Sequence, residues 1–240
     1  MGAEVRVMIS GGFSAAYQRL IPEYERTAGI TVVTCRGASM GSTPNAIPVR
    51  LQRGEPADVV IMVADALDEL VKQGKVVAGT RVDLARSIIG MAVRAGSPKP
   101  DISSVDAFKR VLLEASSIAY SDSASGVYLS TQLFPWLGVA GRISAKCRMI
   151  KGEPVGAVVA RGEAEIGFQQ ISELLPTPGI DLVGPLPPEI QKVTMFAAGI
   201  AAGSKDAKPA RELIAFLASA AAVAAIAKSG LEPVTPTLHK

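Results

Sequence analysis

The chain is poor in the residues on which most hydrolytic and metal-dependent chemistry relies. It has one histidine, His239, near the end of its 240 residues, and two cysteines, Cys35 and Cys147. A serine nucleophile needs a neighbouring base, most often histidine, and a transition-metal site needs a cluster of His, Cys or carboxylate ligands. The two cysteines lie far apart without metal-ligand spacing, which favours two separate buried thiols over a disulfide. We therefore expect no catalytic triad, no metal centre and no cofactor.

Aromatic residues and long runs of one charge are also scarce. Aromatic side chains make up 5% of the chain, the net charge at pH 7 is +3, and no run of Lys or Arg exceeds two residues. This composition does not support nucleic-acid binding and fits a small anionic ligand better than a polyanion. The Ala-rich stretch 215–227 is too short to span a bilayer, which needs about 20 apolar residues. No signal peptide is recognisable, so we expect either a cytoplasmic protein or an exported one whose leader has been removed.

What the chain does have is three loops of small residues, at 10–12, 37–41 and 121–126. Each loop lies between an apolar, strand-like segment and the start of a helical pattern. Backbone N–H groups in such loops can approach a ligand closely, and a helix N-terminus carries about half a positive elementary charge. Several such ends meeting at one point would bind an anion without a metal ion. The three loops therefore predict an anion-binding site.

Strand-like and helical segments alternate along the chain, which predicts an α/β fold with mostly parallel sheets flanked by helices. The expected strands are 4–9, 31–35, 58–62, 87–93, 117–120, 146–150, 166–168 and 193–200. The expected helices include 65–73, 105–114, 126–137, 154–161, 207–218 and 219–228. We expect Pro22 to kink or break the first helix and Gly29 to end it. If the chain forms two lobes, the segments near 83–94 and 193–200 are the crossings between them.

Several short motifs occur in an order that matches one known family. They are Ser10-Gly-Gly-Phe after a strand, Gly37-Ala-Ser39, Arg53-Gly54-Glu-Pro-Ala-Asp58, Leu70-Val-Lys-Gln-Gly74, Ser125-Gly126-Val-Tyr128, Arg161-Gly162-Glu-Ala-Glu-Ile-Gly167 and Phe216-Leu-Ala-Ser before Gly230. Together they cover nearly the whole chain. In this succession they resemble type 2 periplasmic substrate-binding proteins, in the molybdate-binding-like branch.

The resemblance implies two α/β lobes, 1–84 with 196–240 and 85–195, joined by two crossing strands that act as a hinge. Each lobe has a mostly parallel sheet flanked by helices, and a ligand lies in the cleft between the lobes. The resemblance also implies a periplasmic, monomeric receptor that passes a small anion to an ABC permease in the membrane. Asp58, in the Pro-Ala-Asp motif, is expected to be structural.

The sequence departs from the molybdate pattern in the segments that hold the ligand. The family's molybdate site uses a serine in the first loop, where this chain has Gly12, although Ser10 stands two residues earlier. It uses a tyrosine in the last cleft segment, where the best match is Gln170, whereas Ser39 does match the family's second-loop serine. The stretch after Ser39 is also longer than in the molybdate pattern. These departures favour a larger organic anion, a carboxylate, over molybdate.

The predicted ligand-binding residues are Ser10, Gly11, Gly12, Ser39, Met40, Arg50, Ser123, Ser125, Gly126, Tyr128 and Gln170. Some of these residues have an alternative structural explanation. The glycines can serve tight turns, Ser125 can cap the following helix, and Tyr128 can simply pack. Arg50, like Arg36, is either a carboxylate clamp or a solvated surface charge. The pattern Gly37-x-Ser39-x-Gly41 also matches a hydrolase nucleophile elbow, but that chemistry needs a histidine base and only His239 is present.

The sequence therefore predicts a solute-binding protein that captures a small organic anion for ABC-type import. The alternative is a cofactor-independent isomerase on the same fold, similar to proteins of this branch that shift the double bond of a tricarboxylic acid such as aconitate. Such an enzyme needs a positioned acid or base, and the candidates are Tyr17, Tyr120, Tyr128, Glu153 and the loop serines. A ligand-sensing half of a regulator is a third possibility, although no helix-turn-helix or basic segment accompanies it.

Overall fold

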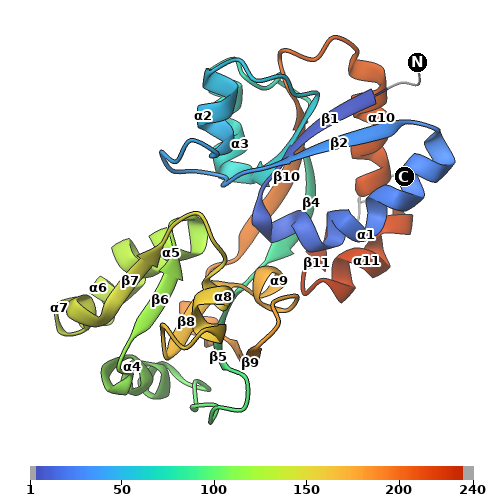
Figure 1. Cartoon of the computed structure of the whole chain (residues 1–240). Helices are drawn as coiled ribbons and strands as arrows, with labels where there is room; N and C mark the ends of the chain where they lie inside the picture. Colours follow the sequence, from blue (N-terminus) through green and yellow to red (C-terminus); the bar gives the residue numbers. More distant parts are fainter. Residues whose placement is uncertain (1–3, 235–240) are drawn as a thin grey trace. The chain divides into compact units, whose positions relative to one another are not determined.

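The computed structural model describes residues 4–234, so His239 lies outside the described residues. The chain folds into two compact units (Figure 1). Unit 1 contains the described residues up to Ser87 and those from Thr194 onward, and unit 2 contains Ile88–Val193. The chain therefore passes from one unit to the other twice.

Within the described residues, unit 1 has a six-stranded sheet in the order β11-β4-β10-β3-β1-β2. The strands are β1 (Glu4–Ile9), β2 (Thr31–Arg36), β3 (Val59–Val63), β4 (Val82–Ser87), β10 (Thr194–Ile200) and β11 (Glu232–Pro233). Strands β1 to β4 run in one direction, and β10 and β11 run against them. The sequence of β3 is apolar throughout, and the strand is buried at every residue because it lies inside the sheet. Strand β2, at the edge, is largely exposed.

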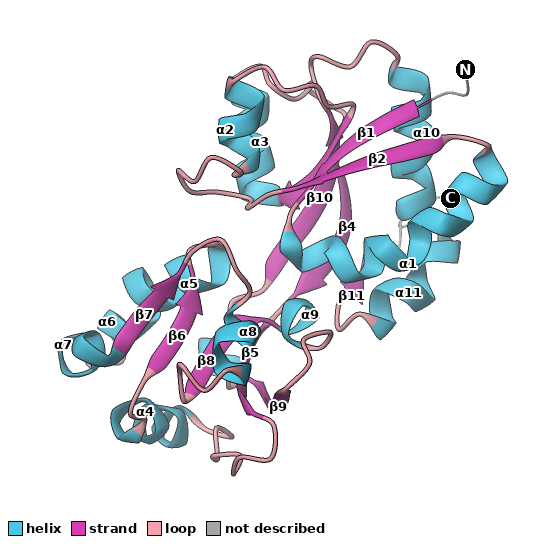
Figure 2. Ribbon diagram, in the orientation of Figure 1, coloured by secondary structure: helices cyan, strands magenta, loops and turns pink. Residues whose placement is uncertain are grey.

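Helices cover both faces of the unit 1 sheet (Figures 1 and 2). They are α1 (Gly11–Ala28), α2 (Ile47–Gln52), α3 (Ala64–Lys72), α10 (Ala207–Leu217) and α11 (Val223–Lys228). Helices α2 and α3 pack on one face, where Leu67 and Leu70 meet Met8 and Met62 of the sheet. Helix α1 packs with α10 and α11 and contacts β2 and β3. Alternate strand residues thus face two separate apolar layers, as the period of a strand requires.

Within the described residues, unit 2 has a five-stranded sheet in the order β7-β6-β8-β5-β9. The strands are β5 (Ile89–Arg94), β6 (Ile118–Ser121), β7 (Cys147–Ile150), β8 (Ile166–Gln170) and β9 (Ile180–Pro185). Its helices are α4 (Val105–Glu114), α5 (Ala124–Tyr128), α6 (Phe134–Trp136), α7 (Ala140–Ile143), α8 (Val155–Ala160) and α9 (Ile171–Leu174). Ser104 caps α4, because its hydroxyl accepts the Ala107 N–H at 3.2 Å.

Two apolar clusters flank this second sheet. On one face Phe108 and Leu112 of α4 pack with Phe168 of β8 and with the residues of α6 and α7. The rings of Phe108 and Phe168 meet edge to face, with centroids 5.7 Å apart. On the other face Val158 and Val159 of α8 pack on β6 and β7. Unit 2 therefore has a core of its own.

The structure corrects three expectations about the helices and strands. Helix α1 continues through Pro22 to Ala28 instead of breaking, because its buried side chains, such as Tyr17 and Tyr24, lie on both sides of the proline. Gly29 ends the helix in the left-handed conformation (φ 67°), as expected. The single helix expected over 126–137 is instead α5, a π-helical turn at Leu129–Leu133 and α6. The strand segment near 83–94 is two strands, β4 and β5, which belong to different units.

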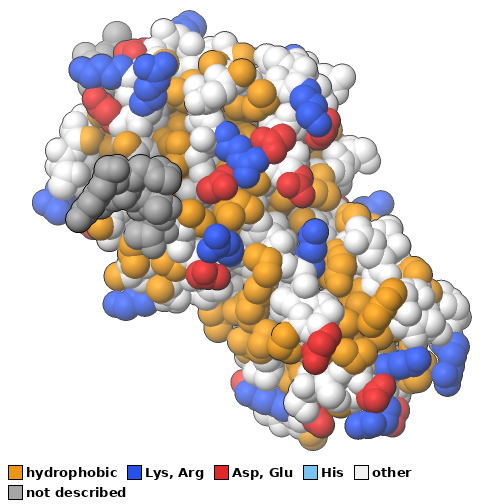
Figure 3. Space-filling model, turned by 180° about the vertical axis from the view of Figure 1, so that it is seen from behind, with side chains coloured by type: hydrophobic (Ala, Val, Ile, Leu, Met, Phe, Trp, Pro, Cys, Tyr) orange, Lys and Arg blue, Asp and Glu red, His pale blue; other side chains and the backbone are white. Residues whose placement is uncertain are grey.

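The surface mixes charged and apolar side chains. Figure 3 shows Lys, Arg, Asp and Glu side chains spread over the visible face, with hydrophobic side chains between them. Among the described residues, no single helix is long and apolar enough to cross a membrane. Helix α10 and the segment Ala220–Lys228 reach that length and composition only as a pair bent by 53°.

Candidate functional site

The ends of three neighbouring strands bring the first two small-residue loops together in unit 1. Ser10 follows β1 and donates its backbone N–H to Ile61 of β3 at 2.9 Å. Gly37 follows β2 and donates its N–H to Ile9 of β1 at 3.0 Å. Because β1, β2 and β3 are parallel neighbours, their carboxyl ends share one edge of the sheet. This edge therefore carries the loop that starts α1 and the loop that leads to α2.

Ser10 has the most informative side chain at this edge. It occupies the N-cap position of α1, but its hydroxyl makes no capping bond to the helix. Among the described residues, only Ser10 Oγ and the Tyr24 hydroxyl are buried without a hydrogen-bond partner, and Ser10 is 3% exposed. An unpartnered buried hydroxyl costs free energy and needs an explanation, such as a missing ligand. Its place beside the positive end of an 18-residue helix makes an anion the matching ligand.

Gly12 lies in the first turn of α1 against the ring of Phe196 from β10. A Cβ atom at position 12 would lie 2.1 Å from Cζ of that ring, far inside van der Waals contact. A side chain at position 12 would therefore force the Phe196 ring or the start of α1 to shift. Gly11, the first residue of α1, is exposed.

Ser39 has a hydrogen-bond partner within unit 1. Its hydroxyl oxygen accepts the backbone N–H of Val63, the residue before α3, at 3.1 Å, and the side chain is 1% exposed. A hydroxyl has one proton to donate in addition to its acceptor sites, so Ser39 can hold Val63 and donate to an anion at the same time. Met40 follows in the loop between β2 and α2, which Figure 2 shows as a long turn, and is half-buried.

Arg50 is held by neighbouring groups. Its Nε donates to Glu55 at 2.7 Å and its Nη1 donates to the backbone oxygen of Arg36 at 3.2 Å. The hydrogen bond to Glu55 raises the pKa of the Arg50 guanidinium above its usual value. The side chain therefore links α2 to the end of β2, and its ion pair with Glu55 would have to rearrange for it to clamp a carboxylate.

Unit 2 has a corresponding edge at the ends of β6 and β8. Ser121 ends β6 and its hydroxyl lies 3.1 Å from that of Ser125, with both residues buried. Gly126 lies against the same strand end, because a Cβ there would be 1.6 Å from the backbone oxygen of Ser121. Ser123, not Ser125, occupies the N-cap of α5, and its side chain makes no capping bond. The expected cap at Ser125 is therefore wrong, since that residue lies inside the helix.

Tyr128 and Gln170 lie in the same unit. The Tyr128 hydroxyl donates to the backbone oxygen of Ile190 at 2.9 Å, and burial raises the pKa of this phenol. Gln170 is the buried last residue of β8. Burial also raises the pKa of Tyr120, and it raises that of Tyr17 to about 12 although Thr34 partly opposes the shift. These tyrosines stay neutral near pH 7 and can donate hydrogen bonds, but they are poor bases.

Sequence reasoning missed Glu173, a half-buried residue of α9. Its carboxylate accepts a hydrogen bond from Nε2 of Gln169 at 3.0 Å. Burial raises the pKa of Glu173 to about 7, and the Gln169 bond lowers it only in part. In the sequence the only signal is a glutamate placed one helical turn after the polar pair Gln169-Gln170 at a strand end.

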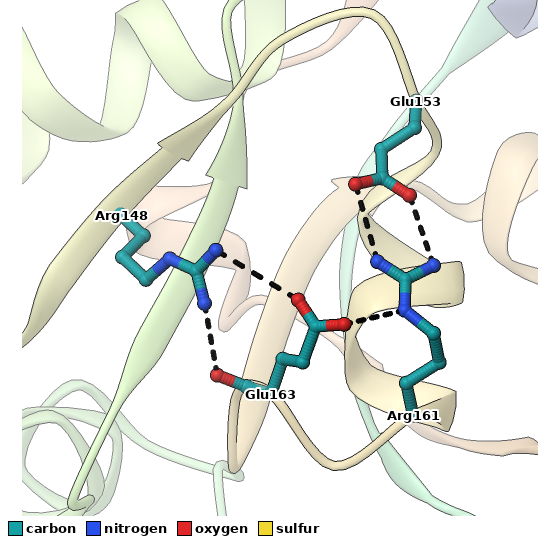
Figure 4. Close-up of polar contacts among 4 residues, drawn as sticks. All are labelled: Arg148, Glu153, Arg161 and Glu163. Atoms are coloured by element: carbon teal, nitrogen blue, oxygen red, sulfur yellow. Dashed lines mark hydrogen bonds and ion pairs between the residues drawn. The ribbon is translucent and has the colours of Figure 1, made fainter.

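Glu153, considered as an acid or base, is part of a surface ion-pair cluster (Figure 4). Arg161 donates to both carboxylate oxygens of Glu153, at 2.9 and 3.2 Å, and its Nε donates to Glu163 at 2.6 Å. Arg148 of β7 lies 3.8 Å from the Glu163 carboxylate. The cluster joins both ends of α8 to β7, and its exposed pairs are held weakly in water. Glu153 is thus engaged by an arginine.

Asp58 is structural, as expected. One carboxylate oxygen accepts the Arg6 N–H at 2.8 Å and the other accepts the Ser204 hydroxyl at 2.7 Å. Within residues 4–234, no group of three or more His, Cys, Asp and Glu side chains is arranged to hold a metal ion.

The fold and these strand-end loops define an α/β binding protein of the type 2 periplasmic class, in its molybdate-binding-like branch. The chain belongs to the family of bacterial extracellular solute-binding proteins, which it matches over residues 5–232.

The similar proteins include both an enzyme and binding proteins. The chain is 54% identical over 228 residues to an aconitate isomerase from Pseudomonas sp., covering 95% of this chain and 87% of that protein. The structure of the sulfate-binding protein SubI from Mycobacterium tuberculosis matches with a TM-score of 0.75 at 20% identity, covering 98% of this chain and 88% of that one. The periplasmic molybdate-binding protein of Azotobacter vinelandii matches with a TM-score of 0.74 at 20% identity, covering 97% and 100%.

Proposed function

We propose that this protein is a cofactor-independent isomerase that moves the carbon–carbon double bond of aconitate. The observation that carries the proposal is the 54% identity to an aconitate isomerase across 95% of the chain. The match extends across both units of the chain. The sequence alone placed capture for import first and the isomerase second, and the identity to an aconitate isomerase reverses that order.

The reaction needs proton transfer and charge stabilisation only. A base removes a proton from the carbon next to the double bond, and that electron pair forms the new double bond. The electron pair of the old double bond then takes up a proton at its far carbon. The negative charge that develops between these steps spreads onto a conjugated carboxylate. Hydrogen-bond donors aimed at that carboxylate lower the barrier, and no oxidant, reductant or metal is required.

The unit 1 edge offers donors suited to a carboxylate. Ser10 has a buried hydroxyl without a partner, and Ser39 keeps a hydroxyl proton beyond its bond to Val63. The N-terminus of α1 adds backbone donors and a positive dipole. Bonds from such groups to a carboxylate are charge-assisted and stronger than neutral ones. In unit 2 we propose that Ser123, Ser125 and Gln170 contact the substrate.

A direct test follows the purified protein with trans-aconitate by ¹H NMR in D₂O. We expect cis-aconitate to appear and deuterium to enter the carbon positions that exchange protons. The same spectra of the protein with citrate give the control for other chemistry. Binding of trans-aconitate without either isomer conversion or deuterium exchange would refute the isomerase and leave a receptor.

The role of Ser10 is tested with two serines of the same helix region. Ser10→Ala removes the unpartnered hydroxyl, and we expect it to weaken aconitate binding by about tenfold or more, since a charge-assisted bond is worth roughly 1.5–3 kcal/mol. Ser14→Ala is the matched control, because Ser14 is also buried in α1 and its hydroxyl accepts from Gln18 at 3.4 Å. Equal affinities for the two variants would remove Ser10 from the site.

The second candidate is capture of a small organic anion in the periplasm for transport by an ABC permease. The match to extracellular solute-binding proteins over residues 5–232 favours it. Thermal shift with molybdate, tungstate, sulfate and mono-, di- and tricarboxylates tests this candidate, because a ligand at a hundredfold excess over its Kd stabilises by about 2.7 kcal/mol. If the protein is a receptor, one of these anions should raise its unfolding temperature and be recovered chemically unchanged.

A further inference from the structure

The end of β6 carries a buried pair of hydroxyl groups. Ser121 is the last residue of β6 and Ser125 lies in the first turn of α5, and their Oγ atoms are 3.1 Å apart. The two residues are 5% and 2% exposed. Their separation is fixed by close packing, since a Cβ at Gly126 would lie 1.6 Å from the backbone oxygen of Ser121. The pair is therefore shielded from solvent and held together by the packing of α5 on β6.

This pair has one hydroxyl proton that no described group accepts. Each serine has one hydroxyl proton, and only one of the two protons can lie between the two Oγ atoms. Within residues 4–234, neither hydroxyl has a hydrogen-bond partner other than its neighbour in the pair. A buried donor without an acceptor costs free energy. The second proton therefore indicates that an acceptor from outside the chain binds here.

A serine in the following turn shows the ordinary way to satisfy such a proton. The Ser130 hydroxyl donates to the backbone oxygen of Gly126, four residues earlier, at 2.8 Å. This is a common arrangement for serine in a helix. The residue four positions before Ser125 is Ser121, yet Ser125 meets the hydroxyl of that residue instead of its backbone oxygen. Local helix geometry thus accounts for the hydroxyl proton of Ser130, and it leaves the spare proton of the pair unexplained.

The fold favours one order of donation within the pair. Ser121 lies inside the sheet, where β6 has β7 and β8 on either side, whereas α5 starts beyond the end of the strand. Donation from Ser121 to Ser125 leaves the Ser125 proton directed away from the strand, toward the edge that carries the predicted ligand loop 121–126. In a chain of two hydroxyls the first polarises the second, which makes the second a stronger donor.

We propose that Ser121 is a positioning residue that aims the hydroxyl proton of Ser125 at an ionised carboxylate of the substrate. The inference rests on the proposed function, which supplies the tricarboxylate. A carboxylate oxygen accepts such a proton in a charge-assisted bond, which is stronger than a bond between neutral groups. Ser121 makes no contact with the substrate itself, and its whole effect on binding passes through Ser125.

A double-mutant cycle tests this order of donation. Calorimetry measures the binding of tricarballylate, the saturated and unreactive tricarboxylate, to the wild type, Ser121→Ala, Ser125→Ala and the double variant. We expect affinity to fall about tenfold or more in Ser125→Ala, which loses the charge-assisted bond, and about threefold in Ser121→Ala, which loses only the polarisation. The double variant should match Ser125→Ala within about twofold, because Ser121 acts only through Ser125. A purely structural effect of Ser121 would instead add to that of Ser125.

Ser130→Ala is the matched control, because its proton is already accepted by the backbone, and it should bind tricarballylate like the wild type. Thermal unfolding without ligand checks that each variant is folded at the titration temperature. If Ser125→Ala does not fold, Ser125→Cys replaces it in the cycle, since a thiol of similar volume is only a weak donor.

Two results overturn the inference while the isomerase stands. They are losses of affinity that add in the double variant, and a larger loss in Ser121→Ala than in Ser125→Ala. A wild-type protein that binds tricarballylate but leaves aconitate unchanged overturns the proposed function alone. A wild-type protein that neither binds tricarballylate nor converts aconitate overturns both.

Discussion

Phe196 of β10 places the tip of its ring against Gly12 in the first turn of α1. A Cβ at position 12 would approach Cζ of the ring to 2.1 Å. At the position where the molybdate-binding branch is expected to carry a serine, the space for a side chain is thus filled by an aromatic ring from a distant strand. We therefore expect an anion at the first loop to be bound by backbone donors and by Ser10.

The contact between Gly12 and Phe196 predicts a rescue experiment. Gly12→Ala should lower the free energy of unfolding by about 1–3 kcal/mol, because an overpacked core must shift either the ring or the helix. Adding Phe196→Leu to Gly12→Ala should recover part of that loss. Urea unfolding measures both effects, and Gly203→Ala is the control, since nothing lies within 4 Å of its Cβ position. If Gly12→Ala is as stable as Gly203→Ala, the ring does not occupy this space.

Ser39→Ala should affect stability and binding together. The Val63 N–H loses its acceptor, which costs about 1–3 kcal/mol for a buried donor. The substrate loses a charge-assisted bond of similar size. Urea unfolding and aconitate calorimetry separate the two losses, and Ser10→Ala should lower affinity alone. Unchanged affinity in Ser39→Ala would limit this serine to a structural role.

Loss of the hydroxyl should affect stability differently at two tyrosines of α1. The Tyr17 hydroxyl is hydrogen-bonded to that of Thr34 at 2.8 Å, so Tyr17→Phe should destabilise the protein by about 1 kcal/mol. The Tyr24 hydroxyl is buried without a partner, so Tyr24→Phe should be neutral or stabilising and should keep the ring contact with Phe216. Thermal unfolding of the two variants checks this order. A larger loss for Tyr24→Phe would reveal a partner for its hydroxyl.

Burial of Glu173 should make stability fall as pH rises. The pKa of this carboxyl is about 7 in the folded protein against an ordinary 4.5, so between these values the folded state keeps a proton that the unfolded chain has lost. The resulting stability is fully present below pH 4.5 and is lost as pH rises through 7, to a total of about 3 kcal/mol. In urea unfolding, the free energy of unfolding of Glu173→Gln should rise relative to that of the wild type between pH 5 and pH 8. The opposite slope would mean that the carboxyl is stabilised as an anion.

The sequence allowed prediction of those parts that depend on local order along the chain. Apolar runs followed by small residues marked the ends of β1, β2 and β6, and Gly29 marked the end of α1. Helix α4 lies at the expected 105–114, and Ser104 caps its first turn. The motifs also gave the family, since they occur in one order across the chain.

Features that depend on contacts between distant segments could not be predicted. The ring of Phe196 reaches Gly12 only because β10 enters the sheet between β3 and β4. The pKa of Glu173 depends on burial beneath α8, β5 and β9, which no local pattern records. Strand β9 was not predicted, because an edge strand with mostly half-buried residues has no clear alternation. The site residues themselves stay predictions until binding is measured.

The position of β10 has a consequence for how the chain is made. This strand lies inside the unit 1 sheet although it comes after all of unit 2 in the sequence. A ribosome therefore releases the whole of unit 2 before the first unit receives its inner strand. Unit 2 can fold early during synthesis, while the unpaired edges of β3 and β4 wait for a partner and are open to aggregation. Pauses or chaperones that act before residue 200 emerges should therefore affect the yield of native protein.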